Sequence, residues 1–170
     1  MRLRDSILGA FAAIMFTSTA ALAGTGFSCL ITGAAEVPAN ASSATGSCTA
    51  VLDNAGTQVI FSVAFQNLGT AYTASHFHAA AGPGVNAGVT FGFSGVAAGW
   101  VFSNSNKNGT LTNAVWNVSA AQKANLLAGL TYVNIHTSGL PGGEIRGQVI
   151  QDQSVPTRNT SWGRMKALYR

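Results

Sequence analysis

The chain has 170 residues, of which 47% are hydrophobic and only 8% are charged. This length favours one domain around a single core, and the composition excludes an intrinsically disordered protein, which needs low hydrophobicity and high net charge. The net charge of +4 is uneven, because residues 24–152 carry three basic and four acidic side chains whereas residues 153–170 carry four basic ones and no acid. The body of the chain therefore has no basic face for nucleic acid.

The first 23 residues have the pattern of a secretory signal peptide. Arg2 and Arg4 precede an apolar run over residues 7–16, and the stretch ends in the small residues of Ala21-Leu22-Ala23. This arrangement predicts cleavage before Gly24 and export to the periplasm or the exterior. The apolar run falls short of the roughly 20 residues that cross a bilayer, so a retained membrane anchor is the weaker interpretation.

After the signal peptide, short β-rich runs are separated by Gly, Asn and Pro. The clearest covers residues 57–65, where Val59, Phe61, Val63 and Phe65 alternate with other residues and predict a strand with one buried face. The expected strands are residues 27–32, 46–52, 57–65, 74–78, 89–93, 100–103, 110–118, 131–137 and 144–150. So many short strands indicate an all-β fold, an antiparallel Greek-key sandwich or barrel.

One segment departs from the β pattern. Ser119 and Gln122 have the spacing of a capping box, helix formers continue to Ala128, and Gly129 follows as a terminator. We expect one short helix here, within a single domain over residues 24–152. The basic residues 153–170 are expected to form a solvated tail.

Cys29 and Cys48 are the two cysteines of the chain. An exported protein meets an oxidising compartment, so we expect a disulfide between neighbouring strands that closes a loop of about 20 residues and stabilises the fold by roughly 3 kcal/mol. The alternative, a metal thiolate, would leave the other cysteine as a free thiol in that compartment.

The histidines are the candidate functional residues. His76 and His78 are two apart in an expected strand and so point to one side, and His136 lies in a second strand on one face with Tyr132 and Asn134. If the two strands are neighbours, three imidazoles converge. Three neutral nitrogen donors with few nearby charges suit a transition metal, with copper first by affinity and zinc second. The alternative is a set of structural or recognition histidines.

Four blocks of the sequence resemble the chordin-type (CHRD) domain. They are LITGAAEVP (residues 30–38), SHFHAAAGPGVN (75–86), LTYVNIHT (130–137) and PGGEIRGQ (141–148). The resemblance spans residues 27–150 and implies an extracytoplasmic β-sandwich module, found singly in bacterial secreted proteins and repeated in animal chordin. The histidine pattern also resembles part of the copper site of copper/zinc superoxide dismutases, but the chain lacks the further histidines that a paired zinc site needs.

Other polar residues lie near the expected site. Asn134 shares a face with His136, and Glu144 and Arg146 share a face of the last expected strand. These three are candidates for orienting the imidazoles. Glu144 and Arg146 are also candidates for attracting an anion, and for these two a cross-strand ion pair worth about 0.2–1 kcal/mol is the preferred interpretation.

The leading functional hypothesis is an exported copper-binding protein with one ion on His76, His78 and His136. It would serve copper handling, or it would be a superoxide dismutase-like oxidoreductase that performs redox chemistry on a small oxygen species. The second hypothesis is a non-enzymatic extracytoplasmic protein-recognition module. A hydrolase is unsupported, because no aspartate is placed behind a histidine near Ser75. A homodimer or an envelope protein partner stays open.

Overall fold

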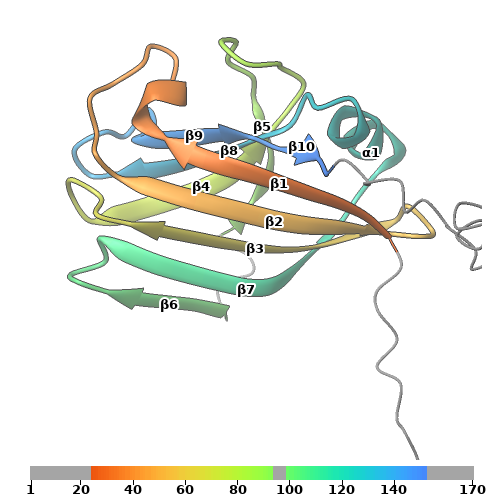
Figure 1. The fold of residues 1–170 in the computed structure, drawn as a ribbon, viewed down its shortest axis with the longest axis horizontal. Coiled ribbons are helices and arrows are strands. Elements are labelled where there is room, and N and C mark those ends of the chain that lie inside the picture. Colours follow the sequence, from red (N-terminus) through yellow and green to blue (C-terminus); the bar gives the residue numbers. More distant parts are fainter. Residues whose placement is uncertain (1–23, 94–98, 153–170) are drawn as a thin grey trace, which may run out of the picture.

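The computed structural model describes residues 24–93 and 99–152 (Figure 1). The expected signal peptide and basic tail lie outside the described residues. The strands are β1 (Gly24–Thr32), β2 (Thr45–Asp53), β3 (Gln58–Gln66), β4 (Tyr72–His78), β5 (Val89–Gly92), β6 (Trp100–Ser103), β7 (Asn108–Asn117), β8 (Tyr132–Thr137), β9 (Ile145–Gln148) and β10 (Ile150–Gln151). The described residues also include a short α-helix, α1 (Ala120–Leu127), and a 3₁₀ turn, η1 (Gly33–Ala35), and strands predominate, so the all-β prediction is confirmed.

The strands form one sheet that curls over on itself into two facing layers. Its order is β5-β4-β8-β9-β1-β2-β3-β7-β6, with β10 paired to the start of β1. In Figure 1, β1, β2, β3, β7 and β6 form the near layer, and β4, β5, β8 and β9 lie behind it. The chain passes between the layers from β3 to β4, from β5 to β6 and from β7 to β8. Such crossings are typical of antiparallel Greek-key sandwiches, as the sequence predicted.

The core lies between the two layers and is aromatic. Val59, Phe61, Val63 and Phe65 of β3 are all at most 4% exposed, so the predicted buried face is confirmed. Phe61 packs edge-on against Phe77 of the opposite layer, with ring centroids 4.9 Å apart. Each such aromatic pair adds about 0.5–1.5 kcal/mol beyond the burial of its area.

The predicted helix forms with its predicted cap. The Ser119 hydroxyl accepts a hydrogen bond from the Gln122 backbone, and the Gln122 side chain accepts one from the Ser119 backbone. Gly129 follows with φ +67°, a backbone conformation that favours glycine. Among the described helices, none is both long and apolar enough to cross a membrane.

The last predicted strand is divided. Residues 145–148 and 150–151 pair with different stretches of the sheet, β9 mainly with β8 and β10 with β1. Val149 lies between them, fully buried, and its backbone N–H donates to the Thr131 carbonyl instead. Glu144 also falls outside the strand. The sequence could not show this break because residues 144–150 are continuously β-favouring.

The two cysteines lie where neighbouring strands pair. Cys29 of β1 is directly opposite Cys48 of β2, with Cys48 buried and Cys29 half-buried. A hydrogen bond between the two side chains, together with burial, raises the pKa of the Cys48 thiol well above its ordinary value. Both are free thiols in the structure, so the adjacency is present and the disulfide itself stays a prediction.

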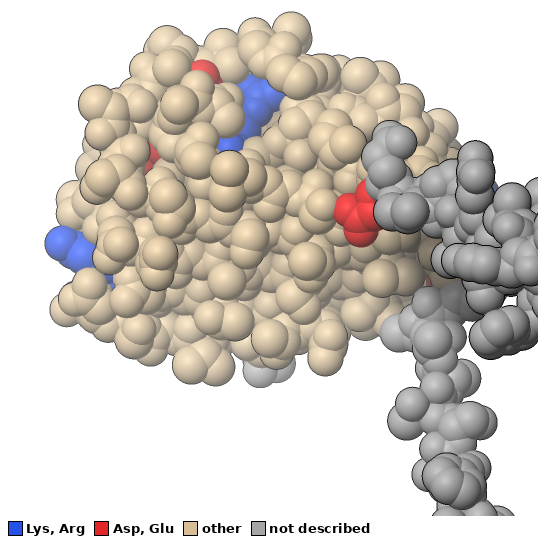
Figure 2. Space-filling view, in the orientation of Figure 1, with Lys and Arg blue, Asp and Glu red and all other residues tan. Residues whose placement is uncertain are grey.

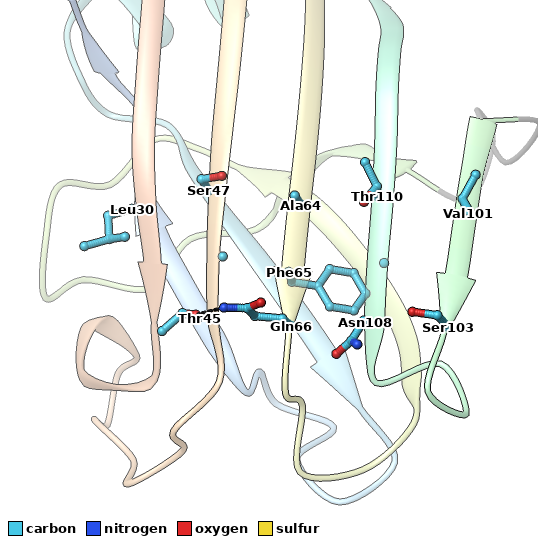
Figure 3. Close-up of a pocket in the computed structure, with 12 residues that line it drawn as sticks. Leu30, Thr45, Ser47, Ala64, Phe65, Gln66, Val101, Ser103, Asn108 and Thr110 are labelled. Carbon is cyan, nitrogen blue, oxygen red and sulfur yellow. Dashed lines mark hydrogen bonds between the residues drawn. The ribbon is translucent and has the colours of Figure 1, made fainter.

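The outer face of the near layer carries a groove across its strands (Figure 3). One row of paired residues crosses β1, β2, β3, β7 and β6, namely Leu30, Ser47, Ala64, Thr110 and Val101. The two ends of the row are large and exposed, Leu30 at 72% and Val101 at 71%, while the middle is small. The groove has a volume of about 500 Å³, and Figure 2 shows that its face carries few charged side chains.

Candidate metal centre

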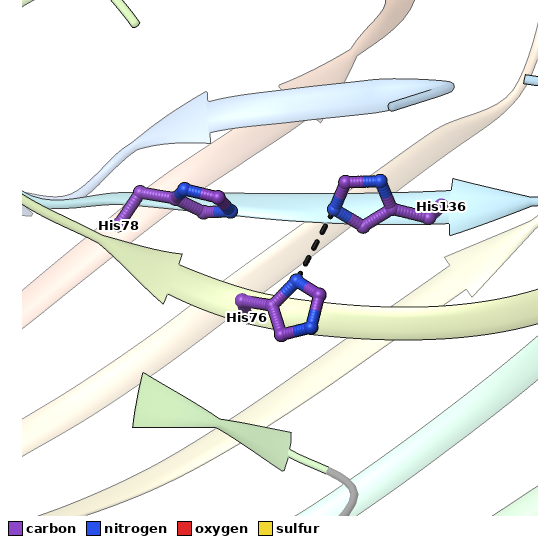
Figure 4. A group of neighbouring side chains, drawn as sticks. All are labelled: His76, His78 and His136. Carbon is purple, nitrogen blue, oxygen red and sulfur yellow. Dashed lines mark hydrogen bonds between the residues drawn. The ribbon is translucent and has the colours of Figure 1, made fainter. Parts of the chain in front are cut away.

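The three predicted histidines come together on the outer face of the far layer (Figure 4). β4 and β8 are direct neighbours, and the register places His76 opposite Asn134 and His136 opposite Ala74. One ring nitrogen of each histidine lies within 4.8 Å of those of the other two. Alternation explains the shared side, since the intervening Phe77 and Ile135 point into the core.

Hydrogen bonds to backbone carbonyls set the tautomers of two rings. Nδ1 of His78 lies 3.0 Å from the Ala87 carbonyl, and Nδ1 of His136 lies 2.9 Å from the Pro141 carbonyl. A carbonyl oxygen only accepts, so each Nδ1 is the donor and each neutral ring keeps its lone pair on Nε2. This leaves Nε2 of His78 and Nε2 of His136 as the available ligand atoms.

The third ring lies against the second. Nδ1 of His76 is 3.2 Å from Nε2 of His136, and their ring centroids are 5.0 Å apart. Because Nε2 of His136 has no proton, the His76 N–H donates to it. A metal ion bound here would displace this hydrogen bond and bind the Nε2 lone pair of His136.

One ligand atom is buried without a partner. Nε2 of His78 is inaccessible to solvent and makes no hydrogen bond within the described part of the chain. A buried polar atom without a partner is costly and needs an explanation. A metal ion next to the cluster would satisfy this atom, so the donor set fits a metal with nitrogen ligands.

The surroundings favour the neutral form of two of the rings, His76 and His78. Burial lowers the pKa of His76, and the neighbouring His136 and His78 lower it further. Burial also lowers the pKa of His78, with smaller effects from His136 and Arg146 that the hydrogen bond to Ala87 opposes. Metals bind neutral imidazole, so both shifts extend the pH range in which ligands are available.

Comparison with known proteins identifies the family. Residues 27–149 match the CHRD domain, which is more than half of the chain. The chain belongs to the CHRD domain family. No match is found among curated proteins or among solved structures. The matched segment contains all three histidines, as the resemblance in the sequence implied.

Glu144 and Arg146 of this CHRD domain make their hydrogen bonds to groups other than the imidazoles. Glu144 accepts hydrogen bonds from Ser42 and Thr137 side chains and from the Gly69 backbone, each 2.7 Å long. Arg146 donates to neutral oxygens in residues 82–86. The predicted ion pair between Glu144 and Arg146 is therefore wrong. The two side chains connect different loops to the sheet.

Asn134 lies on the histidine face, as predicted, but bonds elsewhere. Its Nδ2 is 3.5 Å from Oε2 of Glu36, a carboxyl that is 7% exposed. A Cβ on Gly143 would lie 2.6 Å from both Asn134 and Glu36, so this glycine makes room for the pair. Burial raises the pKa of Glu36 to about 7, and the positive charge of Arg146 offsets this only in part.

Sequence reasoning placed Tyr132 on the face of His136 but gave it no role, and it missed the Ala87 carbonyl. The Tyr132 ring stacks on the His78 ring with centroids 4.8 Å apart and 6° between the planes. Alternation along β8 places Tyr132 on the same face as His136, which was a usable signal. The Ala87 carbonyl had none, because a backbone group in a loop leaves no trace in the residue pattern.

Proposed function

We propose that this CHRD domain protein is exported and binds one copper ion through His76, His78 and His136. The observation that carries the proposal is the approach of three ring nitrogens to within 4.8 Å, with Nε2 of His78 buried and unpartnered. Two nitrogens on one ion lie at most about 4 Å apart, twice a bond of about 2 Å. Side-chain rotations that move the ring nitrogens by about 1 Å would close the remaining gap.

The donor set favours copper. Three imidazoles without a thiolate suit copper and zinc, and copper is first in the affinity order. No carboxylate belongs to the cluster, which argues against calcium and magnesium, since these prefer oxygen. His76 and His136 are half-buried, so a small molecule could reach the centre from solvent. The proposed role is copper handling or redox chemistry on a small oxygen species.

Copper titration of the mature protein tests the proposal. We expect one Cu(II) per chain, and a loss of affinity of at least tenfold in each of His76→Ala, His78→Ala and His136→Ala. Gln66→Ala, an exposed substitution on the other layer, is the control and should bind as wild type. No binding at micromolar copper, or unchanged binding in His136→Ala, would refute the proposal.

Three further measurements refine the proposal. Metal analysis of protein taken from its natural compartment should find copper in place of zinc, and N-terminal sequencing should begin at Gly24. A superoxide disproportionation assay on the copper-loaded protein separates redox turnover from copper handling. Turnover needs an open ligand position on the ion, whereas a carrier needs only affinity and would be inactive in the assay.

The second candidate is a non-enzymatic extracytoplasmic recognition module. The groove between Leu30 and Val101 supports it, since it is an uncharged surface with two exposed apolar side chains. Treatment with a chelator separates the two functions. A recognition module keeps its partner after the metal is removed, whereas a copper protein loses its function.

A further inference from the structure

We propose that Arg146 and Tyr132 are positioning residues that hold His78 with Nε2 directed at the other two histidines. The inference rests on the proposed metal site. It concerns a stack of three side chains from neighbouring strands, His78 on β4, Tyr132 on β8 and Arg146 on β9. Because β8 lies between β4 and β9, the phenol ring lies between the imidazole and the guanidinium.

The stack is close-packed on both sides of the phenol ring. Besides the parallel His78 ring, the guanidinium carbon of Arg146 lies 3.4 Å from the Tyr132 ring centroid. Tyr132 is 2% exposed and Arg146 is 1% exposed. A guanidinium over a ring face is attracted by the ring quadrupole, most strongly where water is excluded. Rotation of the His78 ring away from this stack would lose these contacts.

The same two side chains hold the loop that orients His78. Arg146 donates to the carbonyls of Gly82 and Val85 and to Oδ1 of Asn86, at 2.8–3.3 Å. These residues lie in the loop that leads into Ala87, and the Ala87 carbonyl accepts a hydrogen bond from His78 Nδ1. Without Arg146 these three bonds are lost, and the hydrogen bond from Asn86 Nδ2 to the Val37 carbonyl, 3.0 Å long, is the remaining side-chain bond to residues 82–86 in the described chain.

Tyr132 anchors Ala87 directly. Its hydroxyl accepts from the Ala87 N–H at 3.1 Å and donates to the Ala87 carbonyl at 3.3 Å. The Ala87 carbonyl therefore accepts hydrogen bonds from both the Tyr132 hydroxyl and His78 Nδ1. This places the acceptor for Nδ1 on one side of the ring and leaves Nε2 on the other side, facing the cluster.

Arg146 is an unusual choice for stability alone. Its hydrogen bonds go to neutral oxygens, and Glu36, the buried carboxyl on which its charge acts, has a pKa of about 7 and so is only partly ionised near neutral pH. A buried charge with no close counter-charge carries a large desolvation cost, and an apolar residue of similar size often stabilises as well. A positioning role accounts for the arginine, because its planar fork can bind three oxygens while its face covers the ring.

Substitutions at both positions test the inference. Arg146→Met keeps the length without the fork, Arg146→Lys keeps only the charge, and Tyr132→Phe keeps the ring without the hydroxyl. Lys123→Met, which removes a cation on α1, is the control. In the metal-free protein, ¹⁵N NMR of the imidazoles reports the His78 tautomer. We expect a fixed Nδ1–H tautomer in wild type and control, and tautomer averaging in the Arg146 variants.

The copper titration gives the second measurement. Loss of the groups that orient a metal ligand lowers affinity by about 10–100-fold, so this loss is expected for both Arg146 variants, with a changed Cu(II) EPR spectrum. Tyr132→Phe should show a smaller loss. If Arg146→Met does not fold, Arg146→Lys carries the test. A folded Arg146 variant with the wild-type tautomer and wild-type copper affinity would overturn the inference.

The two proposals can fail separately. If wild-type protein binds no copper but its His78 tautomer is fixed and depends on Arg146, the positioning role stands and the metal site fails. If copper binds equally to wild type and to both Arg146 variants, and the His78 tautomer is the same in all three, the metal site stands and the positioning role fails.

Discussion

Glu36 is expected to make the stability of the fold decrease as pH rises from 4.5 to about 7. Oε1 of Glu36 and Oδ1 of Asn134 are both buried without hydrogen-bond partners in the described chain, and Asn134 Nδ2 lies 3.5 Å from Oε2. A carboxylate that is buried with an unpartnered oxygen is costly, so burial favours the protonated form of Glu36 and raises its pKa. The folded protein therefore favours the neutral acid.

The size of the effect follows from the pKa shift. Burial raises the pKa of Glu36 from 4.5 to about 7 in the folded state. Because the folded state holds the proton more tightly, the contribution is complete below pH 4.5 and is lost as pH rises through about 7. At about 1.4 kcal/mol per unit of pKa the ceiling is about 3 kcal/mol, and solvent screening brings the expected loss to about 2 kcal/mol.

Urea unfolding of metal-free wild type and Glu36→Gln between pH 4.5 and 8 measures it. The glutamine side chain is neutral and can donate a hydrogen bond at every pH, so it mimics the protonated acid. The difference between the two proteins removes the titration of His76 and His78, which is common to both. We expect wild type to lose about 2 kcal/mol relative to the variant. Asp53→Asn, at an exposed carboxyl whose pKa is lowered by hydrogen bonds from Gln58 and Thr57, is the control and should give a flat difference between pH 5 and 8. A flat difference for Glu36→Gln, or a rise with pH, would refute the reasoning.

Two other substitutions and one chemical test probe the stability of the fold. Glu144→Gln places an amide against hydrogen-bond donors from three segments. In urea denaturation it should lower the free energy of unfolding by about 2 kcal/mol, and a change under about 0.5 kcal/mol would contradict the described bonds. Ser119→Ala removes the helix cap and should cost about 1 kcal/mol, read from the thermal midpoint. Protein from an oxidising compartment should resist thiol alkylation until reduced, and reduction of the Cys29–Cys48 pair should cost roughly 3 kcal/mol; prompt labelling of unreduced protein would show that no disulfide forms.

Much of the fold was accessible from local pattern. Strict alternation over residues 57–65 identified β3 and its buried face, and the spacing of Ser119 and Gln122 identified α1 with its cap. These signals are short-range, so each is visible without knowledge of strand pairing. The break at Val149 was invisible, because it depends on a bond to the Thr131 carbonyl from a distant segment.

The candidate site divides in the same way. Alternation along each strand placed His76 with His78, and His136 with Tyr132 and Asn134, on single faces. The sequence by itself thus determined which histidines form the candidate site and that they lie on two strands. It could not determine that β4 and β8 are neighbours, since strand order depends on long-range pairing that leaves no local periodicity.

Only the tertiary structure decided what surrounds the histidines. Glu144 and Arg146 looked like an ion pair because opposite charges two residues apart share a strand face. In the fold, each meets a different loop, and those loops supply closer oxygens and donors than either supplies to the other. The same packing brings Tyr132 and Ala87 against His78. Side-chain identity and spacing set which groups are available, and the folded loops set which partners they find.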